Sequence, residues 1–103
     1  HGMGCGMEMS GEPMDLLRRT MGGYACHANF AGVLIVGLGC ERNQLDALLK
    51  DQGLEAGARL QTFIMQETGG TRKTIEAGVA AVKAMLPAAN DVRREPVPAR
   101  HLK

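Results

Sequence analysis

The sequence has few aromatic residues and almost no excess of charge. It contains no Trp, one Tyr and two Phe, and its 12 Lys and Arg against 11 Asp and Glu give a formal net charge of +1. Nucleic-acid binders use positive surfaces and aromatic stacking platforms, so this composition argues against a nucleic-acid partner. The longest stretch without a charged or strongly polar side chain, residues 30–40, is much shorter than the roughly 20 residues of a membrane-spanning helix. We therefore expect no membrane span.

Cysteine is also scarce, with three residues at irregular spacing: Cys5, Cys26 and Cys40. An odd number without a repeated spacing favours free thiols in a reducing compartment over a disulfide framework. No charged segment leads into an apolar stretch and a cleavage site, so no export signal is predicted and we expect a cytoplasmic protein. Because the chain begins at His1 in glycine-rich sequence and ends after a segment rich in Pro and Arg, we also expect it to be a piece of a longer polypeptide.

The first part of the chain predicts one helix and one strand. Residues 12–21 have the apolar period of a helix, with the pair Gly22 and Gly23 as its stop. The apolar positions of this helix are Met14, Leu17 and Met21. Residues 31–38 form a continuous apolar run without polar alternation, which is typical of a parallel strand covered on both faces.

A second helix and a second strand follow. Asn43 is suited to cap a helix that Gly53 ends, and residues 60–65 predict another short buried strand. The apolar face of this helix consists of Leu45, Leu48 and Leu49.

A third helix opens at residues 69–71, and Pro87 is expected to end it. Its apolar face consists of Ile75, Val79, Val82 and Leu86. No apolar period follows Pro87, so we expect residues 1–88 to be one domain and residues 89–103 to be a linker toward a missing C-terminal domain.

This alternation of helices and strands predicts an α/β domain with a parallel sheet and helices on its faces. Two strands are too few to support three helices, so we expect a further strand that lies partly or wholly upstream of residue 1. The turns after the three strands, residues 1–11, 39–43 and 66–71, would then lie at one edge of the sheet. Open α/β sheets bind their ligands at that edge.

The three turns contain residues that could bind a metal or transfer a proton. The first turn holds His1 and Cys5, the second holds Cys40 and Glu41, and the third holds Gln66, Glu67, Thr71 and Lys73. One imidazole, two thiols and a carboxylate could together ligate Fe(II), Mn(II) or Zn(II). The alternative is that both thiols are buried packing residues, since free cysteine is among the most buried residue types.

The third turn also predicts an anion site. Residues 69–74 read Gly-Gly-Thr-Arg-Lys-Thr, which places backbone N–H groups, a hydroxyl and two cations at a helix N-terminus. The alternative is an ordinary strand-to-helix turn in which Thr71 caps the helix. The segment lacks the full pattern of a nucleotide-binding P-loop.

Other polar residues favour structural roles. Cys26 and His27 precede the first predicted strand and therefore lie at the opposite edge of the sheet. The pairs Arg18–Arg19 and Arg93–Arg94 are expected on solvated or interface surfaces. The seven Met residues are expected mainly to fill gaps in the core.

Three segments, taken in order, resemble the altronate dehydratase and galactarate dehydratase family in its middle region. They are residues 1–6 (HGMGCG), residues 29–41 (NFAGVLIVGLGCE) and residues 69–78 (GGTRKTIEAG). The segment Arg94-Glu95-Pro96 is similar to one that precedes the large C-terminal domain of that family. The sequence departs from the family at His27-Ala28-Asn29, where a central proline is common. The resemblance implies a three-layer Rossmann-like domain with a short, mainly parallel sheet and flanking helices.

The resemblance also implies that the parent enzyme removes water from a sugar acid to give a 2-keto-3-deoxy acid, assisted by divalent iron or a similar metal such as Mn(II). Related members act on other 2-hydroxy acids, including sulfolactate. Carried onto this sequence, the family motifs imply the following roles. Cys5 and Cys40 would be metal ligands. His1 and Glu41 would be catalytic acid or base groups, although Glu41 could equally cap its own helix. The residues that would bind the substrate are Gly69, Gly70, Thr71 and Lys73.

Further site residues would come from the missing N- and C-terminal domains, so the fragment alone is expected to be inactive. Two other functions stay open: a non-catalytic module that binds an anion or small molecule, and a structural or oligomerisation domain. The surface left exposed by missing domains makes a homo-oligomer plausible.

Overall fold

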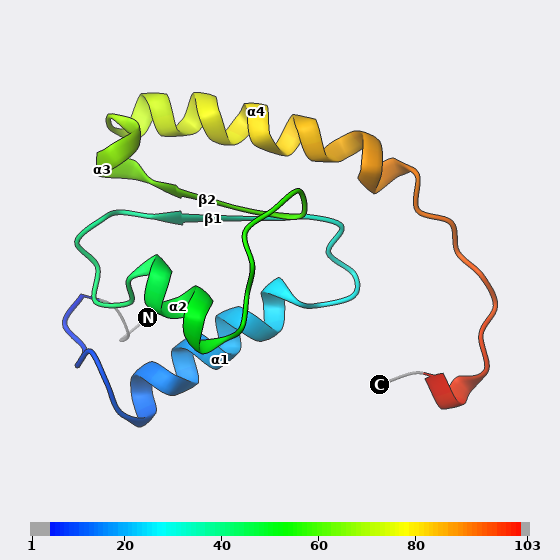
Figure 1. Ribbon diagram of the computed structural model, residues 1–103, viewed down its shortest axis with the longest axis horizontal. Helices are drawn as coiled ribbons and strands as arrows, with labels where there is room; N and C mark the ends of the chain where they lie inside the picture. The colour runs from blue at the N-terminus through cyan, green and yellow to red at the C-terminus, as the bar shows by residue number, and fades with distance from the viewer. Residues whose placement is uncertain (1–4, 102–103) are drawn as a thin grey trace.

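The computed structural model describes residues 5–101 and has three layers (Figure 1). A two-stranded sheet forms the middle layer, helices α1 and α2 cover one face, and helix α4 covers the other. This arrangement confirms the predicted α/β class with a short parallel sheet and flanking helices. The elements in chain order are α1 (Glu12–Ala25), β1 (Val33–Gly37), α2 (Leu45–Asp51), β2 (Leu60–Ile64), α3 (Met65–Thr68), α4 (Thr71–Asn90) and the 3-10 turn η1 (Ala99–His101).

Strands β1 and β2 pair in parallel, from Val33 opposite Leu60 to Gly37 opposite Ile64. The ladder begins where the N–H of Val33 donates to the carbonyl of Arg59 at 2.7 Å. The guanidinium of Arg59 donates to the carbonyls of residues 30 and 31, which fixes the chain entering β1 to the start of β2. Within residues 5–101 no strand pairs with the other edge of β1, which we call the open edge.

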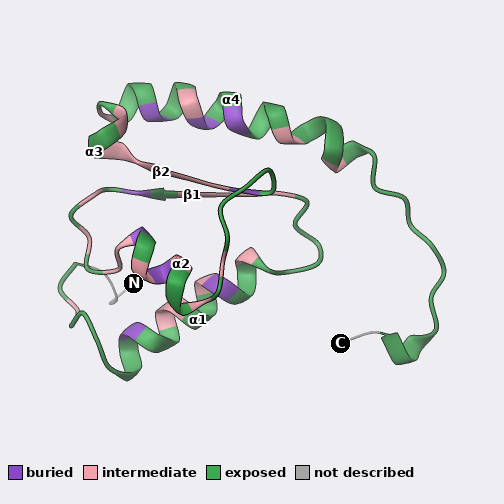
Figure 2. Cartoon of the chain, in the orientation of Figure 1, coloured by how far each residue is buried: buried purple, intermediate pink, exposed green. Residues whose placement is uncertain are grey.

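Buried residues lie on the helices of both faces of the sheet, and the largest fully buried side chains come from α1 and α2 (Figure 2). Met14 and Leu48 are fully buried, and Leu45 is nearly so, as the predicted apolar faces of these two helices require. Helix α1 does not stop at Gly22 and Gly23 but continues to Ala25, because neither glycine adopts a positive φ that would break it. Gly22 is instead buried against the side chain of Gln52, so its role is close packing.

Helix α4 packs on the sheet with a different face from the one predicted. Its buried residues are Thr74, Gly78 and Ala81. The predicted core residues Ile75, Val79, Val82 and Leu86 are all exposed, by 45–60%. The small residues determine which face of α4 contacts the sheet, because only they allow the helix to approach it closely. A Cβ at Gly78 would lie 3.2 Å from the Cδ2 of Leu34. Two strands spaced by roughly 4.8 Å are also too narrow to cover the whole apolar stripe of a helix.

The ends of two helices differ from the predictions. Helix α4 does not end at Pro87 but continues to Asn90. A proline removes one N–H donor and strains the preceding turn, but the residues after it can still be helical. The four residues of α3 replace part of the predicted third turn. Helix α2 has Gln44 rather than Asn43 at its N-cap.

Arg18 lies at a contact between two helices rather than on a solvated surface, and 12% of its side chain is exposed. Its guanidinium donates to the side-chain oxygen of Asn43 at 2.9 Å and forms an ion pair with Asp51. Because Arg18 occupies this side-chain oxygen, Asn43 cannot use it to cap α2, and its amide nitrogen donates to the sulfur of Met21. These contacts join α1 to both ends of α2.

After α4 the chain is exposed and extended as far as η1 (Figure 1). The linker role of residues 89–103 and the domain limit at residue 88 stay predictions. None of the described helices combines the length and apolar character needed to cross a membrane.

Candidate functional site

The carboxyl ends of β1 and β2 lie at one edge of the sheet, and the predicted site residues follow both strands (Figure 1). Cys40 and Glu41 come after β1, whereas the segment from Gln66 to Lys73 comes after β2. Helix α1 also begins at this end of the molecule, after residues 5–11. The described parts of all three predicted turns are therefore found at one edge.

Gln66 connects the two strand ends. Its backbone N–H donates to the carbonyl of Leu38 at 3.2 Å, which extends the ladder beyond the last paired residues of the strands. Its side-chain amide nitrogen lies 3.6 Å from the sulfur of Cys40, and both residues are exposed. The sequence pattern assigned no specific role to Gln66. The signal that reveals it is the strand register, which places Cys40 and Gln66 at nearly the same distance beyond the pair Gly37–Ile64.

The carboxylate of Glu41 folds back over the end of β1. One oxygen accepts a hydrogen bond from the N–H of Gly39 at 2.6 Å, and the other lies against Gly37. A side chain at Gly37 would collide with this carboxylate and with Leu45, so the glycine makes room for it. Glu41 is half-buried and fixed by its own loop rather than by capping α2, whose N-cap is Gln44.

The turn at Gly69 and Gly70 has a conformation that favours glycine, with φ of +98° and +97°. Both backbone N–H groups donate to the carbonyl of Met65, so they are already used inside the turn. Gly70, rather than Thr71, occupies the N-cap position of α4. The amides that precede the first hydrogen bond of α4, those of residues 71–73, are therefore the ones available to an anion.

Two side chains border this helix N-terminus. The hydroxyl of Thr71 points back to the sulfur of Met65 at 3.6 Å. The chain of Lys73 folds over Gly69, and its ammonium nitrogen would lie 3.3 Å from a Cβ at that glycine. The ammonium of Lys73 and the positive end of the α4 dipole thus both favour an anion at the N-terminus of α4.

The predicted metal ligands lie only partly within the described residues. Cys5 and Cys40 are both exposed thiols, which contradicts the alternative that they are buried packing residues. His1 lies outside the described residues. In residues 5–101 no three His, Cys, Asp or Glu side chains lie close enough together to hold a metal ion.

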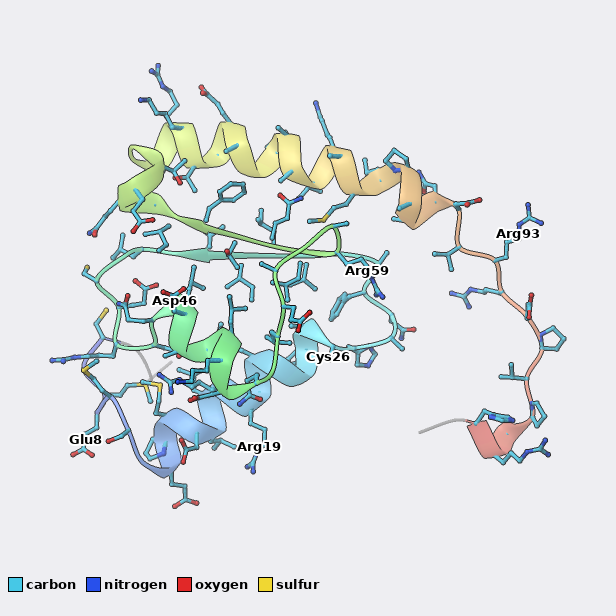
Figure 3. The ribbon with its side chains drawn as sticks, in the orientation of Figure 1. Glu8, Arg19, Cys26, Asp46, Arg59 and Arg93 are labelled. Carbon is cyan, nitrogen blue, oxygen red and sulfur yellow. The ribbon has the colours of Figure 1, made fainter. Side chains whose placement is uncertain are left out.

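Cys26 and His27 lie at the opposite edge of the sheet, as predicted (Figure 3). The ring nitrogen Nδ1 of His27 accepts a hydrogen bond from the N–H of Asn29, and its ring lies 5.7 Å from that of Phe30. These contacts shape the turn that leads into β1. Arg19 and Arg93 are exposed, in agreement with the prediction for them.

Comparison with known proteins identifies related sequences. Residues 1–90 match the family model described as D-galactarate dehydratase/Altronate hydrolase, second domain. Altronate dehydratase from Bacillus subtilis (strain 168) is 38% identical over 77 residues, which cover 75% of this chain and 15% of that protein. The chain therefore spans only a small part of the relative it matches. No solved structure matches the chain.

Proposed function

Because the chain belongs to the D-galactarate dehydratase/altronate hydrolase family, whose second-domain model it matches over residues 1–90, we propose that it is one domain of a larger sugar-acid hydro-lyase. The resemblance seen in the sequence is thereby confirmed at the level of the family. The proposed substrate is altronate or galactarate. A base removes the proton from C2, the carbon next to the carboxylate. The hydroxyl on C3 then accepts a second proton and leaves as water. The resulting enol tautomerises to the 2-keto-3-deoxy acid.

One observation carries this proposal: two of the three family segments meet at the carboxyl edge of the sheet. The segment containing Cys40 and Glu41 and the segment containing Gly69 to Lys73 belong to different strand ends, and Gln66 touches Cys40 between them. This edge is where open α/β sheets bind small ligands. The edge would face the substrate in the proposed enzyme.

The start of α4 would bind the substrate carboxylate. The ammonium of Lys73, the amides of residues 71–73 and the helix dipole all favour negative charge there. Gly69 and Gly70 supply the turn that presents these groups, and Thr71 begins the helix. The same positive groups would stabilise the enediolate that forms when the neighbouring proton is removed.

Glu41 and His1 are the proposed acid and base groups. Elimination needs one group that takes a proton and one that gives a proton to the leaving hydroxyl. Glu41 supplies one orientated carboxylate, with one oxygen held by Gly39. The second group would be His1 or a residue of another domain, so we expect the 103-residue chain to be inactive alone.

Cys5 and Cys40 are the proposed ligands of a divalent metal, Fe(II) or Mn(II). The described residues do not form a complete donor set, so most ligands would come from His1 and from other parts of the enzyme. The amount of bound iron and manganese, measured anaerobically in the native-length protein and in its Cys5→Ser and Cys40→Ser variants, tests this assignment. Unchanged metal content in both variants would exclude the two thiols as ligands.

The carboxylate role of Lys73 is tested by dehydration assays on the native-length protein with altronate and galactarate. A charge-assisted contact contributes about 1.5–3 kcal/mol, so Lys73→Met should lower kcat/KM by about 10- to 100-fold. Lys50→Met, which removes an exposed lysine at the far end of α2, is the control and should have no effect. Equal activity of the two variants would refute the role of Lys73.

The same assays distinguish the other functions. Binding of the sugar acid without turnover by the native-length protein would indicate a non-catalytic module, and release of sulfite from sulfolactate would indicate a related sulfo-lyase. A homo-oligomer is tested by sedimentation of the same sample. The proposed location is the cytoplasm, where three exposed thiols stay reduced, and cell fractionation checks it.

A further inference from the structure

The open edge of β1 presents backbone groups that no strand among residues 5–101 pairs with. The N–H of Val33 donates toward β2, and successive residues of a strand alternate in direction. The N–H and C=O groups of Leu34 and Val36 therefore point away from β2, toward the open edge. Val36 is 45% exposed although it lies in the middle layer of the domain. Exposed strand edges of this kind readily pair with another strand.

Apolar grooves lie on both sides of this edge. On the α4 side, a groove of about 460 Å³ runs along Leu34 and Val36 and beneath the exposed stripe of α4 that includes Val79 and Val82. On the other side, a groove of about 390 Å³ runs along Val33 and Ile35 and beside the end of α1. The two grooves share strand β1 and lie on its opposite faces.

A strand is the occupant that fits both grooves at once. Its side chains alternate between the two faces of a sheet, so one apolar strand would fill both grooves while it pairs with Leu34 and Val36. A helix would fill one groove and leave the backbone groups of the edge unpaired. The open edge therefore favours an added strand over a helix.

The path of the chain indicates where this strand comes from. Helix α1 begins at the carboxyl edge and runs back to the start of β1, as the helix of a strand–helix–strand unit does (Figure 1). Helices α1 and α2 cover the same face of the sheet. About 98% of such crossovers have the same hand, so crossovers on one face step across the sheet in one direction. Because β1–α2–β2 steps toward β2, a strand that precedes α1 lies on the opposite side of β1, at the open edge.

Helix α4 supports the same conclusion independently. It covers the other face of the sheet. Its stripe of exposed apolar residues overhangs that edge, where the described sheet ends. The stripe is thus placed to cover strands beyond β1.

We propose that the open edge of β1 binds a further β-strand, parallel to β1, that the same polypeptide supplies ahead of residue 1. The related altronate dehydratase has much chain outside the matching stretch, which is 15% of that protein, and the matching family model is described as a second domain. This added strand would bury Val36 and the α4 stripe and would bring a further strand end to the carboxyl edge.

Amide hydrogen exchange of the native-length protein, measured by NMR, tests the proposal. Val33 and Ile35 pair with β2 and serve as internal references. We expect the amides of Leu34 and Val36 to exchange within about tenfold of these references, because an added strand accepts their hydrogen bonds. Exchange at Leu34 and Val36 more than about 100-fold faster than at the references would overturn the proposal. Protection that disappears on dilution would also overturn it, because a second copy would then occupy the edge.

A substitution pair gives a second test in the same protein. Val36→Lys places a charge where the added strand would pack, so it should raise the exchange rate at Leu34 by at least about tenfold. Val97→Lys, at an exposed position beyond α4, is the control and should leave that rate unchanged. If the amide exchange rate at Leu34 is unchanged in both variants, burial of Val36 by an added strand is refuted.

Discussion

Replacing Gly22 with alanine tests the close contact between α1 and α2. A Cβ at this position would lie 2.9 Å from the Cβ and 2.8 Å from the Cγ of Gln52. The Cβ of Gln52 is fixed to its backbone, so the methyl group fits only if α2 moves. Overpacking of this kind costs about 1–3 kcal/mol, whereas the better helix propensity of alanine returns about 0.5–1 kcal/mol. We expect Gly22→Ala to lower the free energy of unfolding by about 1 kcal/mol.

Gly23→Ala is the matched control on the same helix. No described atom lies within 4 Å of a Cβ at Gly23, so only the gain in helix propensity remains. Urea unfolding followed by far-UV circular dichroism should therefore rank the proteins as Gly23→Ala, wild type and Gly22→Ala, from most to least stable. If Gly22→Ala is as stable as Gly23→Ala, the α1–α2 contact does not constrain this position and the reasoning fails.

Three further substitutions test local features by unfolding measurements. Gly70→Ala forces a side chain into φ +97° and ψ 178° and should destabilise the protein by about 1–3 kcal/mol in thermal unfolding, whereas an unchanged Tm would contradict the turn geometry. Thr74→Val removes a buried hydroxyl that donates to the carbonyl of Gly70 at 2.9 Å, so urea unfolding should show a loss of about 1 kcal/mol. Arg18→Met breaks the contacts with Asn43 and Asp51 and should cost about 1–2 kcal/mol; a neutral result would show that these contacts are not stabilising.

Most of the fold could be predicted from the sequence because local patterns determine it. The apolar period around Met14 and the uninterrupted run through β1 identify their elements without tertiary information. The inward face of α4 could not be predicted in this way. Hydropathy favours Val79 and Val82, but the contact with the sheet depends on which side permits close approach, and Gly78 provides it. A pattern of apolar residues predicts that a helix face will be buried, but it does not predict which other element buries it.

The site could be predicted only in outline. The position of Cys40 and Lys73 at strand and helix ends follows from element order, which the sequence shows. The contact between Gln66 and Cys40 depends on the register of β1 against β2, and register is a property of the packed sheet. The fold of the Glu41 carboxylate over Gly37 likewise depends on a loop conformation that hydropathy does not encode.

The parallel register has a consequence for how the protein folds. Val33 meets Leu60 only after the whole of α2 and its flanking loops have been brought together, so the ladder begins with a non-local contact. Such contacts carry the entropy of loop closure and slow the folding reaction. The two strands of the described residues are parallel, so they form no hairpin that could fold first and guide the rest. Cys40 and Gln66 therefore become neighbours only when β1 and β2 pair, so a chain in which the sheet has not closed lacks this contact.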